Sequence, residues 1–188
     1  MSLDCEYNQN QNDKTTQGEV IQIGAVVYNC VSGDIIDTIN LNVRIEDPIY
    51  PFITELTGIT TEYNQKGMPL LEAYSLLKDF HAKHPLFIMT PLLWGTGVVS
   101  DSHEIYRQVC RLSPNLDNFM GRRSLDLKTL VQLKVLAKGG AKSGGLKTVI
   151  QRNELKWDYT HGAPHDAVAD AFNTALLHIK LNKDIFGA

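Results

Sequence analysis

Two apolar, β-branched runs constrain the fold of this chain more than any other feature of its sequence. The first covers residues 19–29 (EVIQIGAVVYN) and the second residues 35–45 (IIDTINLNVRI). A short turn at 32–34 (SGD) separates them, and two such runs joined by a glycine-containing turn predict an antiparallel hairpin. Residues 2–6 predict a short strand upstream, before the polar loop 8–18.

The rest of the chain alternates helical patterns with short apolar runs. Amphipathic spacing, capping residues and glycine stops mark the helices. A strand meander followed by strands that alternate with helices predicts an α/β fold, with a mixed five-stranded sheet flanked by helices. The expected helices are a short one ended by Gly58, then 69–83, 101–112, 126–137, 146–152 and 166–182, and the expected further strands are Leu86–Met89 and 124–127.

Length and composition favour a single intracellular domain over residues 1–188. The chain is long enough to bury one core, and its 43% hydrophobic and 21% charged residues exclude wholesale disorder. No apolar run approaches the length of a membrane span, and no signal peptide begins the sequence. The three scattered cysteines fit neither a disulfide framework nor a zinc site, so we expect a reducing cytoplasm.

The charge of the chain is unevenly distributed. Residues 122–147 hold seven Lys and Arg against Asp126 alone, a charge of +6, which leaves −9 for the rest of a chain whose total is −3. A basic segment on an acidic body can attract phosphate groups locally. The same lysines could equally solvate a helix face, and the sequence leaves both interpretations open.

Asp4 and Glu6 are the first candidate functional residues. They lie one residue apart on an expected strand, so both carboxylates project from the same face, about 7 Å apart. Paired carboxylates at this spacing suit hard divalent cations. Because the D-x-E pattern also occurs by chance on solvated surfaces, the pair depends on its context.

The segment HDAVADA at 165–171 supplies that context. Asp166 is a natural N-cap, which places His165 in the loop before the last helix and Asp170 in its first turn. The positive end of the helix dipole favours a carboxylate there. A histidine on a loop beside a carboxylate on a rigid helix is a suitable pair for a base and a metal ligand.

Several motifs, read in order, now give a family resemblance. They are LDCE near the N-terminus, GEVIQIGAVVYN, ITELTGIT, WGTGVVSD, SLDLKTL and HDAVADA. In this order, across nearly the whole chain, they resemble the DEDDh exonucleases, the group that contains proofreading exonucleases and RNase T. The resemblance implies a ribonuclease H-like fold and a 3′→5′ exonuclease.

The resemblance also implies roles for individual residues. Asp4 and Glu6 match the first acidic motif, Asp170 matches the last carboxylate, and His165 matches the general base. The pattern fits a second time with His161 and Asp166. We prefer His165 and Asp170, because that register continues the family's helix and keeps Pro164 outside it.

The second acidic motif is looser. In place of the family's Phe-Asp pair the chain has Val99-Ser100-Asp101, and Asp101 begins an expected helix as the family ligand does. Glu104, one turn further on, is the alternative ligand.

The implied cofactors are two divalent cations, Mg²⁺ or Mn²⁺, held by Asp4, Glu6, Asp101 and Asp170. The implied substrate is a nucleic acid, most simply a single-stranded 3′ end, and the products are nucleoside 5′-monophosphates. Leu56, in ITELTGIT, is a candidate wedge against the terminal base or an ordinary core residue, and Tyr7 is a candidate contact to the sugar. DNA and RNA are not distinguished, and neither is the oligomeric state.

Two other functions are compatible with the residues. One is a catalytically silent nuclease-fold module that binds nucleic acid or a protein. The other keeps the chemistry but acts on dinucleotides or very short oligomers. The presence of candidates for all five family residues favours an active enzyme.

Overall fold

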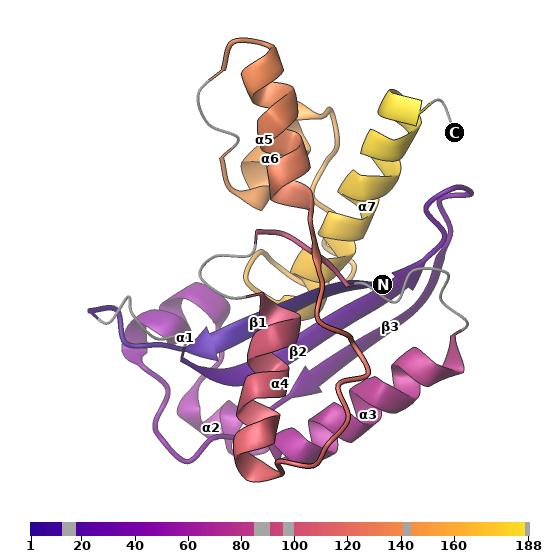
Figure 1. Cartoon of the computed structure of the whole chain (residues 1–188). Coiled ribbons are helices and arrows are strands. Elements are labelled where there is room, and N and C mark those ends of the chain that lie inside the picture. The colour runs from indigo at the N-terminus through magenta and orange to yellow at the C-terminus, as the bar shows by residue number, and fades with distance from the viewer. Residues whose placement is uncertain (13–17, 85–90, 96–99, 141–143, 187–188) are drawn as a thin grey trace.

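A computed structural model of the chain describes residues 1–12, 18–84, 91–95, 100–140 and 144–186. Its strands and helices alternate as the sequence predicts after an initial three-stranded meander (Figure 1). The expected strand Leu86–Met89 lies outside the described residues. None of the helices described is both long and apolar enough to cross a bilayer.

One mixed sheet forms the centre of the molecule, and it confirms the expected fold class. Its strands lie in the order β3-β2-β1-β4-β5. β2 runs antiparallel to both of its neighbours, β1 and β3, while β4 pairs parallel with β1 and β5 pairs parallel with β4. The strands are β1 Ser2–Asn8, β2 Glu19–Tyr28, β3 Ile35–Asn42, β4 Leu92–Leu93 and β5 Leu125–Asp126.

Some of the helices begin or end at residues with clear capping roles. Gly58 ends the first helix in the left-handed conformation, with φ 76°, as its position after LT predicts. Asp126 caps α5 by accepting hydrogen bonds from the backbone N–H groups of Lys128 and Thr129. The helices are α1 Pro51–Thr57, α2 Thr61–Asn64, α3 Leu70–Lys83, α4 Asp101–Leu112, α5 Leu127–Ala137, α6 Leu146–Arg152 and α7 Ala167–Phe186.

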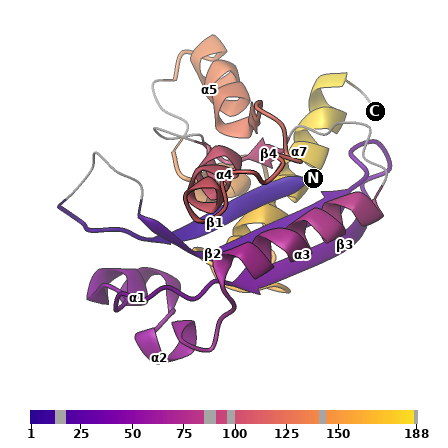
Figure 2. The same ribbon diagram turned by 60° about the horizontal axis from the view of Figure 1, so that its bottom comes forward.

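Helices cover both faces of the sheet (Figure 2). On one face α3 and α4 pack over alternate residues of β1 and β2, among them Leu3, Cys5 and Ile23. On the other face α7 packs against Val26 through Val168 and Phe172. Because side chains alternate along a strand, Asp4 and Glu6, the β1 residues on either side of Cys5, face α7.

Gly24 sets how closely α7 approaches the sheet. A Cβ at this position would lie 2.2 Å from the backbone carbon of Ala167 and 2.2 Å from the nitrogen of Val168. Only glycine therefore allows the first turn of α7 to lie directly on β2. Gly24 is paired with Asp4 across the β1–β2 ladder, so this close contact occurs beside the first candidate carboxylate.

Candidate active site

Asp4 and Glu6 lie on the α7 face of β1, as strand alternation predicts. Their neighbour Cys5 points into the opposite, α3–α4 side of the core, together with Leu3. Both carboxylates are half-buried. The start of β1 therefore presents two acids to the space between the sheet and α7.

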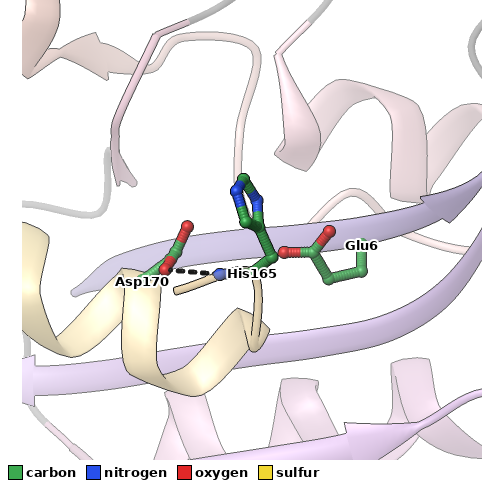
Figure 3. Close-up of side chains that lie close together, drawn as sticks. All are labelled: Glu6, His165 and Asp170. Atoms are coloured by element: carbon green, nitrogen blue, oxygen red, sulfur yellow. Dashed lines mark hydrogen bonds between the residues drawn. The ribbon is translucent and has the colours of Figure 1, made fainter. Parts of the chain in front are cut away.

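His165 and Asp170 complete one side of the site. Ligand atoms of Glu6, His165 and Asp170 all lie within 4.8 Å of one another. Figure 3 shows the Glu6 carboxylate and the imidazole approaching from different elements, β1 and the loop before α7. The His165 backbone N–H donates to Asp170 Oδ1 at 3.2 Å, and its φ of 69° turns the loop into the helix.

Gln22 positions this end of α7 and was not predicted as a site residue. It is buried on β2, paired with Glu6 across the ladder. Its Oε1 accepts a hydrogen bond of 2.9 Å from the backbone N–H of Ala167, the first residue of α7. The sequence signal that could have indicated this role is that Gln22 is a polar residue within the apolar run 19–29 and lies on the same face of the strand as Gly24.

Asp101 approaches the site from the N-terminus of α4. Its Oδ1 accepts a hydrogen bond of 2.7 Å from the Tyr7 hydroxyl. Tyr7 lies on the same side of β1 as Leu3 and Cys5, facing α4, and the pairing of β1 with β2 shifts register between Glu6 and Tyr7. The negative charge of Asp101 is close enough to Asp4 to raise the pKa of that carboxyl.

Glu104 points to a different set of partners. Its side chain is 1% exposed, and it accepts hydrogen bonds from Arg107 Nε at 2.7 Å and from Gln108 Nε2 at 2.6 Å. Arg107 Nη2 forms a second contact with the same carboxylate. Of the two candidates for the second motif, the structure thus places Asp101 beside Asp4 and occupies Glu104 in an ion pair.

Burial is the largest cause of a raised pKa at each of the four carboxylates. Nearby negative charges add to it: other members of the cluster act on Asp4 and Glu6, Glu104 acts on Asp101, and Asp166 acts on Asp170. The pKa of Asp4 lies well above its usual range, that of Glu6 rises to about 8, and those of Asp101 and Asp170 rise to about 7. Such a cluster of hard oxygen donors is electrostatically suited to divalent cations.

His161 and Asp166, the alternative pair for the last motif, have other structural roles. The His161 ring packs against Phe172 with ring centroids 4.5 Å apart. Asp166 immediately precedes α7, and its Oδ1 accepts from the backbone N–H of Val168 at 3.2 Å, as expected of an N-cap. Ligand atoms of His165 and Asp170 thus lie within 4.8 Å of those of Glu6. Asp166 acts on Asp4 and Glu6 through its charge, which raises the pKa of both, while its carboxylate caps α7.

The other predicted positions lie around this centre. Leu56 is 46% exposed on α1, so its interpretation as an ordinary core residue is wrong. Within residues 122–147, Lys142 lies outside the described part of the chain, and the basic side chains that are described are exposed or half-buried. Lys134 lies 4.0 Å from Asp184 on α7, so part of this charge is balanced within the fold.

Comparison with solved structures gives close matches in fold. A structure of a 3′-exonuclease recognising a histone mRNA stem-loop superposes with a TM-score of 0.78 at 19% identity, covering 97% of this chain and 80% of the other. The nuclease domain of 3′hExo, a DEDDh family member bound to rAMP, gives 0.78 at 19% identity over 97% and 90%. S. pombe Pop2p with Mg²⁺ and Mn²⁺ bound gives 0.62 at 17% identity over 98% and 83%.

Comparison at the sequence level identifies the family. No curated protein matches the chain. The family described as exonuclease, of RNase T type, matches residues 1–177. This match confirms the resemblance inferred from the motifs, and the chain belongs to the RNase T-type exonuclease family.

Proposed function

We propose that this chain is a metal-dependent 3′→5′ exonuclease that removes nucleoside 5′-monophosphates from the 3′ end of a nucleic acid. The observation that carries the proposal is that ligand atoms of Glu6, His165 and Asp170 lie within 4.8 Å of one another. The charges of Asp101, Glu6 and Asp170 also act on Asp4, so the four carboxylates from β1, α4 and α7 lie near one another. Membership of the exonuclease family supports the proposal. The three free cysteines fit action in a reducing compartment such as the cytoplasm.

The carboxylate cluster fits two divalent cations. Burial and neighbouring negative charges raise the pKa values of Glu6, Asp101 and Asp170, and a bound cation would offset both effects. Asp4, Glu6, Asp101 and Asp170 would hold the ions, Mg²⁺ or Mn²⁺. When bound, such ions supply a water of lowered pKa and stabilise charge on the scissile phosphate.

His165 is the proposed general base. Its loop position leaves the ring accessible, and loss of hydration lowers its pKa below the ordinary value of roughly 6.5. The ring is therefore neutral at neutral pH and can accept a proton at a ring nitrogen. The hydrogen bond from its backbone N–H to Asp170 fixes the loop while leaving the side chain available.

Leu56 and Tyr7 are the proposed substrate contacts. Leu56 offers an exposed apolar surface to an unpaired terminal base, a contact that tolerates any sequence. Because the Tyr7 hydroxyl is bonded to Asp101, we assign Tyr7 first to holding that carboxylate and second to lining the sugar site. Solved structures of similar fold bind rAMP and a histone mRNA stem-loop, which supports an RNA or DNA 3′ end as substrate.

One gel tests the proposed function. The protein is incubated with 5′-labelled single-stranded DNA, single-stranded RNA and duplexes, in Mn²⁺ or in EDTA. The proposal expects a ladder that shortens from the 3′ end in Mn²⁺ alone, lost in Asp170→Asn and kept in the exposed control Asp79→Asn on α3. If no substrate is degraded under any condition, the chain is a silent binding module and the proposal is wrong.

A further inference from the structure

A groove of about 850 Å³ opens between α4, the end of β1 and the start of β2. Its wall includes Arg107 and Arg111 on α4, Arg44 after β3, and Tyr50 at the start of α1. This volume is within the range of pockets that hold ligands, roughly 300–1,000 Å³. None of these four residues belongs to the proposed metal site.

Two elements, β1 and α4, carry residues of both the carboxylate cluster and the groove. Arg107 binds Glu104, one turn along α4 from Asp101, and Asn8 at the groove follows Tyr7, which binds Asp101. From Asp101 to Arg111 the helix rises about 15 Å, at about 1.5 Å per residue. A stacked strand advances about 3.4 Å per nucleotide, so this length accommodates about four nucleotides.

Hydrogen bonds hold the walls of the groove in place. Gln108 Nε2 donates to the carbonyl of Gly18 at 2.9 Å, and its Oε1 accepts from the backbone N–H of Val20 at 3.1 Å. Asn8 Oδ1 accepts from the Tyr50 N–H at 2.9 Å, and its Nδ2 donates to the carbonyl of Pro48. The α4 wall, the end of β1 and the Tyr50 loop are thus fixed relative to one another.

The lining has the composition that a single strand of nucleic acid requires. Arginines can bind successive phosphates, and an aromatic ring offers a stacking surface for any base. Tyr50 is 40% exposed, and Arg44 and Arg111 are exposed as well. Glu19 and Glu46 also line the groove and would repel phosphates.

We propose that this groove binds the single-stranded segment of the substrate 5′ of the nucleotide being removed, with phosphates against Arg44, Arg107 and Arg111 and a base on Tyr50. The inference rests on the proposed exonuclease function and deepens it by naming the substrate class. It implies that oligomers several nucleotides long are preferred over dinucleotides, which reach only the carboxylate cluster.

Binding in EDTA tests the groove independently of catalysis. Fluorescent ten-nucleotide DNA and RNA strands are titrated against wild type, Arg44→Ala/Arg111→Ala and Lys66→Ala/Lys78→Ala, a charge-matched control at two exposed lysines outside the groove. Loss of two phosphate contacts should weaken binding at least tenfold and reduce the slope of log K against log salt by about 1.4.

Tyr50→Ala should weaken binding fivefold or more and Tyr50→Phe should restore it, because the phenyl ring still stacks. Glu46→Gln should tighten binding.

Steady-state rates in Mn²⁺ separate the groove from the catalytic centre. The double arginine variant should raise KM for the ten-nucleotide strand at least tenfold and leave turnover of a dinucleotide unchanged. If it behaves like Lys66→Ala/Lys78→Ala in both assays, or if it lowers dinucleotide turnover equally, the upstream strand does not lie in this groove. A wild type that binds the strands through the groove in EDTA but degrades none in Mn²⁺ would refute the exonuclease function alone.

Discussion

The Tyr7 hydroxyl donates a hydrogen bond of 2.7 Å to Asp101 Oδ1, across 94 positions of the sequence. This bond connects the residue after the first acidic pair to the first residue of α4. The hydrogen bond opposes the effect of burial on Asp101. Burial raises the pKa of this carboxyl, donation from the Tyr7 hydroxyl to the ionised form lowers it, and the resulting pKa is about 7. Tyr7 therefore helps keep Asp101 charged.

Tyr7→Phe should consequently weaken metal binding in a pH-dependent way. Without the hydroxyl the pKa of Asp101 rises further, so a larger fraction is protonated near pH 7 and Mn²⁺ affinity falls several-fold. At pH 8.5 most of the loss should be recovered, because the carboxylate is ionised again. Isothermal titration with Mn²⁺ at both pH values measures this, and an equal loss at both would mean that Tyr7 acts by packing alone.

Asp101→Asn and Glu104→Gln should have opposite effects. Asp101→Asn relieves repulsion among the carboxylates, so the metal-free protein should be at least as stable as wild type, while metal-dependent turnover is abolished. Glu104→Gln breaks a buried ion pair with Arg107 and should cost about 3 kcal/mol of unfolding free energy. Thermal denaturation with and without Mn²⁺ separates the two, because stabilisation by Mn²⁺ should persist only in Glu104→Gln. The reverse pattern would make Glu104 the ligand.

The elements that carry this site were predictable where local signals determine them. The hairpin of β2 and β3 follows from two β-branched runs and a glycine turn, and α4 begins at Asp101 and ends at Leu112 as predicted. The common face of Asp4 and Glu6 follows from strand alternation alone. The four-residue α2 was not predicted, since its only local signal is the Thr60 cap.

Contacts between distant segments were not predictable in the same way. Asp101 and Glu104 lie within one turn of the same helix, and both are acids near the expected position of the second motif. Only the packing of α4 on the sheet decides that Glu104 turns to Arg107 while Asp101 meets Tyr7. Similarly, Gln22 can accept a hydrogen bond from the start of α7 only because of where α7 packs on β2.

Metal binding should release protons at neutral pH. The pKa of Glu6 is raised to about 8 and those of Asp101 and Asp170 to about 7, so the metal-free site holds protons that bound ions displace. Calorimetric titration with Mn²⁺ at pH 7, in two buffers of different ionisation enthalpy, should show a release of at least one proton. An enthalpy that does not depend on the buffer would contradict the raised pKa values.

The same pKa values fix how stability varies with pH. Each of these carboxyls has a folded pKa above its unfolded value of about 4, so the folded state binds more protons between about pH 4 and 8. In EDTA their contribution to stability is therefore lost as the pH rises through that window. Denaturation midpoints at pH 5, 6, 7 and 8 should show the decline for wild type and a smaller decline for Asp101→Asn, and Mn²⁺ should reverse it.

His165→Ala should lower kcat by about 10²- to 10⁴-fold, the usual contribution of a general base. Because His165 lies within 4.8 Å of the Glu6 and Asp170 ligand atoms, the alternative is that it binds the metal itself. Unchanged Mn²⁺ affinity in the variant supports the base, whereas a loss of affinity would make His165 a ligand. The αL backbone at φ 69° favours Asn over Ala, so His165→Asn is the better-folded control for the same loss.

Gly24→Ala should disable the site without touching any of its charged residues. The added methyl group would overlap the backbone of Ala167 and Val168 at 2.2 Å, and backbone cannot yield as a flexible side chain can. The start of α7 must then move away from β2, which stretches the Gln22 bond to Ala167 and carries Asp170 away from Glu6. We expect a loss of about 1–3 kcal/mol in stability and weaker Mn²⁺ binding in the fraction that folds.

Ala25→Gly, one position along β2 and facing the α3–α4 side of the core, is the matched control: it should cost stability but leave Mn²⁺ affinity intact. If Gly24→Ala bound Mn²⁺ as tightly as this control, the close approach of α7 to β2 would not be what holds Asp170 at the metal site.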